Sequence, residues 1–147
     1  MALTHAASAG LTATGCSLHT LPVSTDPRGS LAVAHTDAVL AAEAKRVFLV
    51  FDVPADAHRG GHANRRAAEV LIAATGSVSV IVDNGHIEHR VLLDRPTLAL
   101  RIPPMVWTAQ QDFHPGTALV VIASHDYDPD DYIGDYAEFR RNAHASH

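Results

Sequence analysis

The sequence predicts an all-β protein, a barrel or sandwich of short antiparallel strands that ends in a short C-terminal helix. Apolar and β-branched segments of a few residues recur along the chain, and clusters of Gly, Pro, Asn and Asp separate them. About ten such segments are present, and this alternation of short strands and turns is typical of antiparallel sandwiches and barrels. The segments expected to form strands include residues 16–21, 31–34, 46–53, 69–74, 77–82, 87–93, 98–102, 106–111 and 118–123.

The strand assignments rest on composition and on alternation. Residues 46–53, RVFLVFDV, are β-branched and aromatic, and such residues favour strands. Residues 77–82, SVSVIV, alternate polar and apolar positions, as a half-buried strand does. The dipeptide Asn84-Gly85 then predicts a tight hairpin to the strand at 87–93.

Turns and helices are expected at four further places. Residues 26–29, DPRG, predict a turn, and residues 54–61 read as a loop. Residues 37–45 have the composition of one or two helical turns, and residues 127–141 predict a turn followed by a short helix.

The chain of 147 residues is expected to form one domain. We expect a flexible leader at 1–14, one folded domain at 15–141 and a tail at 142–147. The single cysteine, Cys16, excludes a disulfide within the chain. No signal peptide and no apolar run of membrane-spanning length is evident, so a cytoplasmic location is expected.

The charge of the chain argues against two classes of partner. The net charge is −5, which offers no broad electrostatic attraction to nucleic acid or to a membrane surface. We therefore expect neither as a partner. Local basic residues could still hold a small anionic ligand.

The stretch from Arg59 to Gly76 carries a motif that marks the pocket of cupin jelly-roll barrels. That motif normally reads His-x-His, a gap of three or four residues, Glu, a gap of six residues, and Gly. His62, Glu69 and Gly76 keep this spacing, but Asn64 stands where the second histidine belongs.

The changed motif weakens the case for a metal. A carboxamide such as that of Asn64 is a poor substitute for imidazole on a transition metal. No histidine follows Pro103-Pro104, where the second cupin motif normally supplies another ligand. We expect no metal and no other cofactor, although a metal bound by His62, Glu69 and a distant histidine stays a weaker alternative.

Without a metal, His62 is the natural proton carrier of the pocket. Imidazole has a pKa near 6.5 and can take and return a proton at neutral pH. His62 follows Gly60-Gly61, which allows a close approach of backbone and ligand. The alternative is a histidine that is satisfied within the barrel wall.

Four other side chains are candidate ligand contacts. Arg28, Arg59 and Arg101 sit at strand ends or turns, where arginine can clamp a phosphate, although each alone is more often a surface residue. Trp107 could stack on a base or sugar, or it could be a core or dimer-interface residue.

Taken together, these residues resemble a known family, the nucleotide-sugar 3,4-ketoisomerases, also called WxcM-like cupins. The likeness runs from Asp26 to Phe139, and the closing segment with Asp131-Tyr132-Ile133 is especially distinctive. The matching segments are residues 26–31, 45–48, 59–63, 76–78, 103–107, 112–113 and 123–133, followed by Asp135-Tyr136 and Phe139.

The resemblance implies a specific activity. Members of the family are metal-free cupin homodimers that exchange N-terminal strands. They move the ketone of dTDP-4-keto-6-deoxyglucose from C4 to C3 through an enediol, and the products enter aminated deoxysugars of glycans or antibiotics. Carried over, His62 is the base that takes the C3 proton, Arg59 helps to place the nucleotide sugar, and Arg28 reaches the other subunit's pocket.

The active site expected from motif and resemblance has nine members. They are His62, Asn64 and Glu69 for catalysis, and Arg28, Phe48, Arg59, Arg101, Trp107 and Ser124 for substrate binding.

The chain also departs from the family in the pocket. A tyrosine is common at Phe48, a glutamine at Glu69, a second histidine at Asn64, an acidic residue at His35, and an arginine or histidine at Thr108. Two interpretations follow. In the first, the chain is still a ketoisomerase: Glu69 fixes the His62 tautomer, and Asn64 or water occupies the second proton position. In the second, it is a diverged metal-free cupin. The diverged protein would catalyse another proton transfer, such as epimerisation or cyclisation, or would only bind a ligand.

Overall fold

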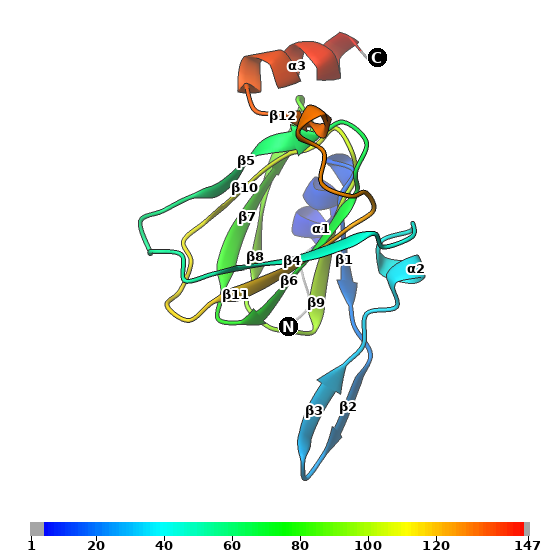
Figure 1. Ribbon diagram of the computed structural model, residues 1–147, viewed down its shortest axis with the longest axis vertical. Coiled ribbons are helices and arrows are strands. Elements are labelled where there is room, and N and C mark those ends of the chain that lie inside the picture. Colours follow the sequence, from blue (N-terminus) through cyan, green and yellow to red (C-terminus); the bar gives the residue numbers. More distant parts are fainter. Residues whose placement is uncertain (1–4, 146–147) are drawn as a thin grey trace.

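The computed structural model describes residues 5–145 and folds them into two facing β-sheets with helices on the outside (Figure 1). The leader positions 1–4 and the tail positions 146–147 lie outside the described residues. The strands are β1 (Ser17–Thr20), β2 (Val23–Asp26), β3 (Gly29–Ala32), β4 (Arg46–Phe51), β5 (Arg59–Asn64), β6 (Glu69–Thr75), β7 (Val78–Asp83), β8 (Glu88–Leu93), β9 (Leu98–Ile102), β10 (Trp107–Gln111), β11 (Ala118–Ala123) and β12 (Tyr132–Ile133). The helices are α1 (His5–Ala13), α2 (Thr36–Val39), the 3₁₀ turn η1 (Pro129–Asp131) and α3 (Tyr136–Ala145).

The two main sheets each have five strands, and all their pairings are antiparallel. One sheet has the order β1-β9-β6-β11-β4 and the other β12-β5-β10-β7-β8, while β2 and β3 form a separate hairpin. Neighbours in the sheets are often far apart in sequence, as in a jelly roll. The predicted all-β jelly-roll barrel with a short C-terminal helix is confirmed.

The core lies between the two sheets because inward positions alternate along the strands. Leu71 of β6, Val80 of β7, Leu100 of β9 and Leu119 of β11 belong to this central apolar cluster. Phe48 and Val50 of β4 reach the same cluster from the edge of the first sheet. The cavity described below, which is mostly apolar with a few polar groups, opens beside this core.

Each outer face carries a smaller apolar cluster. Val39 and Leu40, in and after α2, pack on the outside of the first sheet. On the second sheet, Phe139 and Ala143 of α3 pack on Ala63 and Ile133. The C-terminal helix therefore covers β5 and β12, as Figure 1 shows at the top of the molecule.

Several boundaries differ from the sequence predictions. Within the expected leader, residues 5–13 form α1, whose Leu11 is buried in the central cluster. The expected tail at 142–147 continues α3 as far as Ala145. The loop predicted at 54–61 ends at His58, because β5 begins at Arg59 and accommodates two glycines as a bulge.

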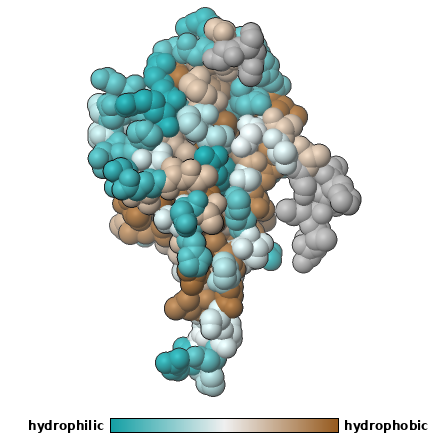
Figure 2. Space-filling model, turned by 90° about the vertical axis from the view of Figure 1, so that its right-hand side faces the viewer, coloured by the Kyte–Doolittle hydropathy of each residue, from teal (hydrophilic) through white to brown (hydrophobic). Residues whose placement is uncertain are grey.

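The β2–β3 hairpin protrudes from the body of the molecule in both views (Figures 1 and 2). All its strand residues are exposed. The predicted turn at 26–29 forms its tip, which is hydrophilic, whereas the base near the body is hydrophobic (Figure 2). Within residues 5–145, no helix is long and apolar enough to cross a membrane.

Candidate active site

A cavity of ≈ 80 Å³ opens between the sheets where β4, β5, β6, β10 and β11 meet. Its walls combine apolar side chains of the core with a few polar groups. The lining residues are Phe48, Val50, Arg59, Gly60, His62, Glu69, Leu71, Thr108, Gln110 and Val121. The motif residues His62 and Glu69 thus face one space, although they lie on different sheets.

A glycine bulge places His62 in this cavity. Gly60 and Gly61 have φ angles of 77° and 75°, in the left-handed region that favours glycine. In the pairing with β10, His62 lies opposite Thr108 and Gly60 opposite Ala109, so Gly61 is the extra residue of the bulge. A Cβ on Gly60 would lie 2.9 Å from the Thr108 carbonyl oxygen, which explains why only glycine fits there.

The surroundings of His62 favour its neutral form. Burial lowers the pKa of His62, and the positive charge of Arg46 lowers it further, while the Gly60 backbone, the Asn64 side chain and Asp131 act in the opposite direction. The Nε2 atom is buried and has no hydrogen-bond partner among the described residues. The imidazole packs edge-on against Tyr132, with ring centroids 4.7 Å apart. His62 is therefore a neutral imidazole, held in place by its neighbours, whose buried Nε2 has no partner in the described part of the chain.

Glu69 is the second titratable group of the cavity. It points to the same side of β6 as the core residue Leu71, and it is only 5% exposed. Burial raises its pKa to about 7, an effect that Arg46 opposes and Asp131 reinforces. A carboxyl with such a pKa can donate or accept a proton at neutral pH.

Arg46 does not line the cavity, but it lies close enough to influence both titratable groups, and the motif reasoning did not single it out. Its guanidinium lies 5.2 Å from the Phe48 ring centroid, and its Nη1 donates to the Tyr132 hydroxyl at 3.3 Å. The Nε is buried and has no partner among the described residues. Its charge lowers the pKa of both His62 and Glu69. Arg46 therefore contributes, after burial, to the pKa values of both groups from β4.

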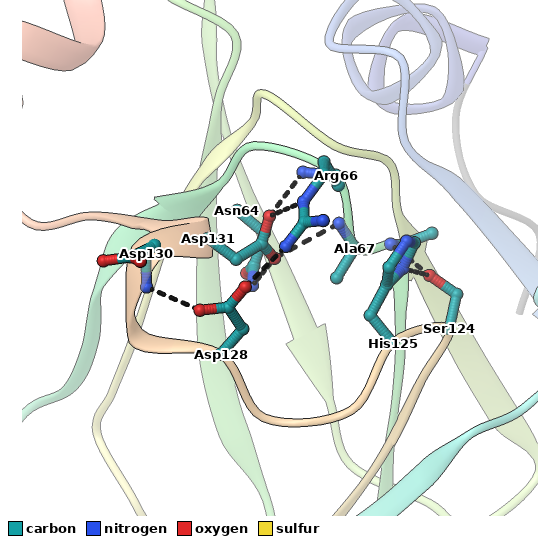
Figure 3. Close-up of polar contacts among 9 residues, drawn as sticks. Asn64, Arg66, Ala67, Ser124, His125, Asp128, Asp130 and Asp131 are labelled. Atoms are coloured by element: carbon teal, nitrogen blue, oxygen red, sulfur yellow. Dashed lines mark hydrogen bonds and ion pairs between the residues drawn. The ribbon is translucent and has the colours of Figure 1, made fainter.

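Asn64 does not line the cavity; it joins a network centred on Asp131 (Figure 3). Its Nδ2 donates to Asp131 Oδ2 at 3.0 Å. The Asp131 carboxylate also accepts from the backbone amides of Arg66 at 2.7 Å and Ala67 at 3.3 Å, and from Arg66 Nε at 3.4 Å. Asn64 thus acts as a support beside His62, and its amide is already engaged.

Of the expected substrate-binding residues, Phe48 and Arg59 line the cavity. Arg59 also lines a second, more open cavity of ≈ 330 Å³, formed by residues 49–54 and 57–59. The two cavities share Val50 and Arg59. A ligand could therefore extend from the inner cavity past Arg59 into the outer one.

The other four expected contacts lie away from the inner cavity. Trp107 lies on the outer face of β10, where it packs on Tyr136 and Phe139 with centroids 5.2 and 5.8 Å away. Arg101 Nε donates to the Leu40 carbonyl at 2.8 Å on the outside of the first sheet. Ser124 Oγ accepts from the Ala68 amide at 2.9 Å. Arg28 sits at the hairpin tip, with its side chain 90% exposed and paired with Asp26.

Within the chain, Trp107, Arg101 and Ser124 contact other protein groups, and Arg28 lies at the exposed tip of the hairpin. A role of these four residues in substrate binding therefore stays a prediction. Besides Arg46, the lining residues Thr108 and Gln110 were missed as contacts, and the hydrogen bond of 3.1 Å between their side chains holds both in place.

The structure also bears on the metal alternative. Within residues 5–145, no three His, Cys, Asp or Glu side chains are grouped so that they could hold a metal ion. His62 and Glu69 thus gain no third donor from that part of the chain.

Comparison with known families and proteins gives a consistent result. Residues 14–144 match the family described as FdtA, WxcM-like C-terminal. A curated relative, the TDP-4-oxo-6-deoxy-alpha-D-glucose-3,4-oxoisomerase of Aneurinibacillus thermoaerophilus, is 36% identical over 116 residues, which cover 79% of this chain and 84% of the relative.

Solved structures of 3,4-ketoisomerases match most of the chain. The TDP-quinovose 3,4-ketoisomerase WlaRB from Campylobacter jejuni has a TM-score of 0.83 and 35% identity, and the match covers 86% of this chain and 98% of that one. The sugar 3,4-ketoisomerase QdtA from Thermoanaerobacterium thermosaccharolyticum, in complex with TDP, has a TM-score of 0.85 and 30% identity, with 89% and 96% covered.

Proposed function

The chain belongs to the FdtA, WxcM-like C-terminal family, and we propose that it is a sugar 3,4-ketoisomerase acting on a TDP-4-keto-6-deoxyhexose in deoxysugar biosynthesis. The observation that carries the proposal is His62, a neutral, buried imidazole whose Nε2 has no partner among the described residues and which lines the inner cavity. Such a group can remove a proton from carbon beside a ketone and return it to the neighbouring carbon.

The proposed reaction begins at C3 of the sugar. His62 takes the proton from C3, which is acidified by the ketone at C4, and an enediol forms across the two carbons. The imidazolium then returns a proton to C4 and leaves the ketone at C3. The lowered pKa of His62 suits this role because the base is already neutral when the substrate binds.

The two adjoining cavities support a nucleotide-sugar substrate. The inner one, at His62 and Glu69, would take the sugar, and the outer one, beside His58 and Arg59, would take the nucleotide. Arg59 stands where the two cavities join, and a guanidinium there can pair with diphosphate oxygens.

A homodimer with exchanged N-terminal segments is part of the proposal. The protruding β2–β3 hairpin lacks packing of its own, and Leu31 on it is 59% exposed. β4 lies at the edge of its sheet and presents three apolar side chains that are about as exposed as Leu31: Val47, Leu49 and Phe51. A partner's hairpin laid along this strand would cover both surfaces and bring the partner's Arg28 toward the cavity. The cytoplasmic location stays a prediction.

The test is direct. Purified protein is incubated with TDP-4-keto-6-deoxyglucose in deuterated water, and the sugar is followed by NMR. We expect deuterium in the sugar and formation of the 3-keto product, and we expect His62→Ala to lose both. TDP binding without either change would contradict the proposal and favour the diverged protein described above.

A further inference from the structure

We propose that Glu69 is the second acid–base group of the reaction and passes a hydroxyl proton between the two sugar oxygens. The inference rests on the ketoisomerase function proposed above and adds a role to it. It starts from the placement of Glu69, a buried carboxyl that lines the same cavity as His62.

The chemistry of the isomerisation requires two proton movements. The hydrogen on C3 must leave and a hydrogen must arrive on C4, which is the work proposed for His62. In addition, the proton on O3 must leave and a proton must arrive on O4. C3 is oxidised and C4 is reduced by the same electron pair, so no external oxidant or reductant is needed. The oxygen proton still needs a carrier.

Glu69 is placed to be that carrier. Among the residues that line the cavity, only His62 and Glu69 titrate near neutral pH. Glu69 makes no hydrogen bond to any residue in the described part of the chain, and its oxygens are not sealed from the cavity. Both oxygens are therefore available to a substrate.

The neighbouring polar groups cannot take this role. Phe48 has no hydroxyl. The Asn64 amide donates to Asp131, and the Thr108 hydroxyl accepts from Gln110. The Arg59 guanidinium is a hydrogen-bond donor only and offers no acceptor atom for the proton.

A protonated carboxyl fits the transfer because it donates from one oxygen and accepts at the other. As His62 removes the C3 hydrogen, the Glu69 O–H protonates O4, and the enediol is formed. As the imidazolium protonates C4, the proton on O3 passes to a Glu69 oxygen and the C3 ketone forms. Glu69 ends protonated and His62 neutral, so the site is ready for another turnover.

The charges around Glu69 permit this protonated state. Arg46 faces it from β4, His62 and Arg59 line the same cavity from β5, and Asp131 acts from η1. Burial is the largest influence and raises the pKa of Glu69 to about 7. Turnover should therefore fall as the pH rises through about 7, because the carboxyl loses the proton that it must donate.

The experiment compares the wild type with Glu69→Gln. The amide can still donate a hydrogen bond to O4 but cannot carry a proton away. We expect Glu69→Gln to bind TDP normally and to exchange the C3 hydrogen for deuterium. Its formation of the 3-keto product should be slower by about 10²–10⁴-fold. The control is Glu88→Gln, an exposed glutamate of β8, which should behave as the wild type.

Each outcome decides one question. If Glu69→Gln turns over at the wild-type rate, the proposed role of Glu69 is wrong. The pH profile of the wild type is a second test, which does not require the variant to fold. A wild-type rate constant that stays flat from pH 6 to pH 9 would also overturn the role of Glu69. If the wild type itself gives neither exchange nor product, the proposed function fails instead.

Discussion

Arg46 links the two titratable groups of the cavity, so its charge should set the pH range of activity. His62 must be neutral, and its lowered pKa means that activity is lost as the pH falls through a value below about 6.5. Glu69 must be protonated, and activity is lost as the pH rises through about 7. Arg46 lowers both pKa values, so Arg46→Gln should shift both limbs of the pH–rate profile to higher pH.

The matched control is Arg46→Lys, which keeps the positive charge and should leave the profile near that of the wild type. The rate constant for product formation, measured across pH 5–9 for the three proteins, checks the prediction. A profile of Arg46→Gln that superimposes on the wild type would contradict the electrostatic role of Arg46.

The residue scale also shows what could be predicted from the sequence. His62 and Glu69 were identified because both belong to one stretch with a known spacing. Arg46 was not among the predicted site residues, because strand order brings it near Glu69: both pair with Ala123 of β11, which lies between β4 and β6 in the sheet. Asn64 keeps its place in the motif, but its orientation depends on Asp131, which is 67 residues away in the chain.

At the scale of elements, one buried carboxylate fastens the η1–β12 segment to the loop between β5 and β6. Asp131 is 3% exposed, and its hydrogen bonds reach Asn64, Arg66 and Ala67. Asp131→Ala would leave two buried donors, Asn64 Nδ2 and the Ala67 amide, and the partly buried Arg66 amide without an acceptor. We expect it to lower the free energy of unfolding by about 2–3 kcal/mol in urea denaturation.

The neighbouring Asp130→Ala is the control. Asp130 is exposed, and its hydrogen bond uses its backbone amide, so its replacement should change stability little.

The stabilisation that Asp131 provides should depend on pH. Burial alone would raise its pKa, but the hydrogen bonds it accepts hold the pKa below its usual value. Its stabilisation is therefore present above about pH 4 and disappears as the pH falls through the lower folded-state pKa. Equal losses for both variants at pH 7 would contradict this assignment.

The elements themselves were predicted unevenly. The strands with strong alternation or β-branched composition, such as 46–53 and 77–82, appear as β4 and β7 because local preference and burial agree there. The two-residue strand β12 gave no signal of its own, because its pairing with β5 depends on the Asp131 anchor. α1 was missed because its small residues look like a leader until Leu11 is seen in the core.

At the scale of the whole molecule, the proposed exchange predicts that each active site combines two chains. His62 would come from one subunit and Arg28 from the hairpin of its partner. Each single variant, His62→Ala or Arg28→Ala, should be impaired, with Arg28→Ala losing about tenfold or more in apparent affinity for the substrate. In a mixed dimer of the two variants, one site keeps both wild-type residues and the other loses both.

Coexpression with two different tags yields this mixed dimer, and we expect it to have about half of the wild-type activity per dimer, far above the sum of the two variants. Adding Val47→Lys to both chains should abolish the recovery, because it places a charge on the exposed apolar face of β4 where the partner's hairpin would lie, outside both cavities. Leu92→Lys, at a similarly exposed leucine of β8, is the matched control and should preserve the recovery. A mixed dimer no more active than Arg28→Ala alone would show that Arg28 does not act across the subunits, and the hairpin would then need another role.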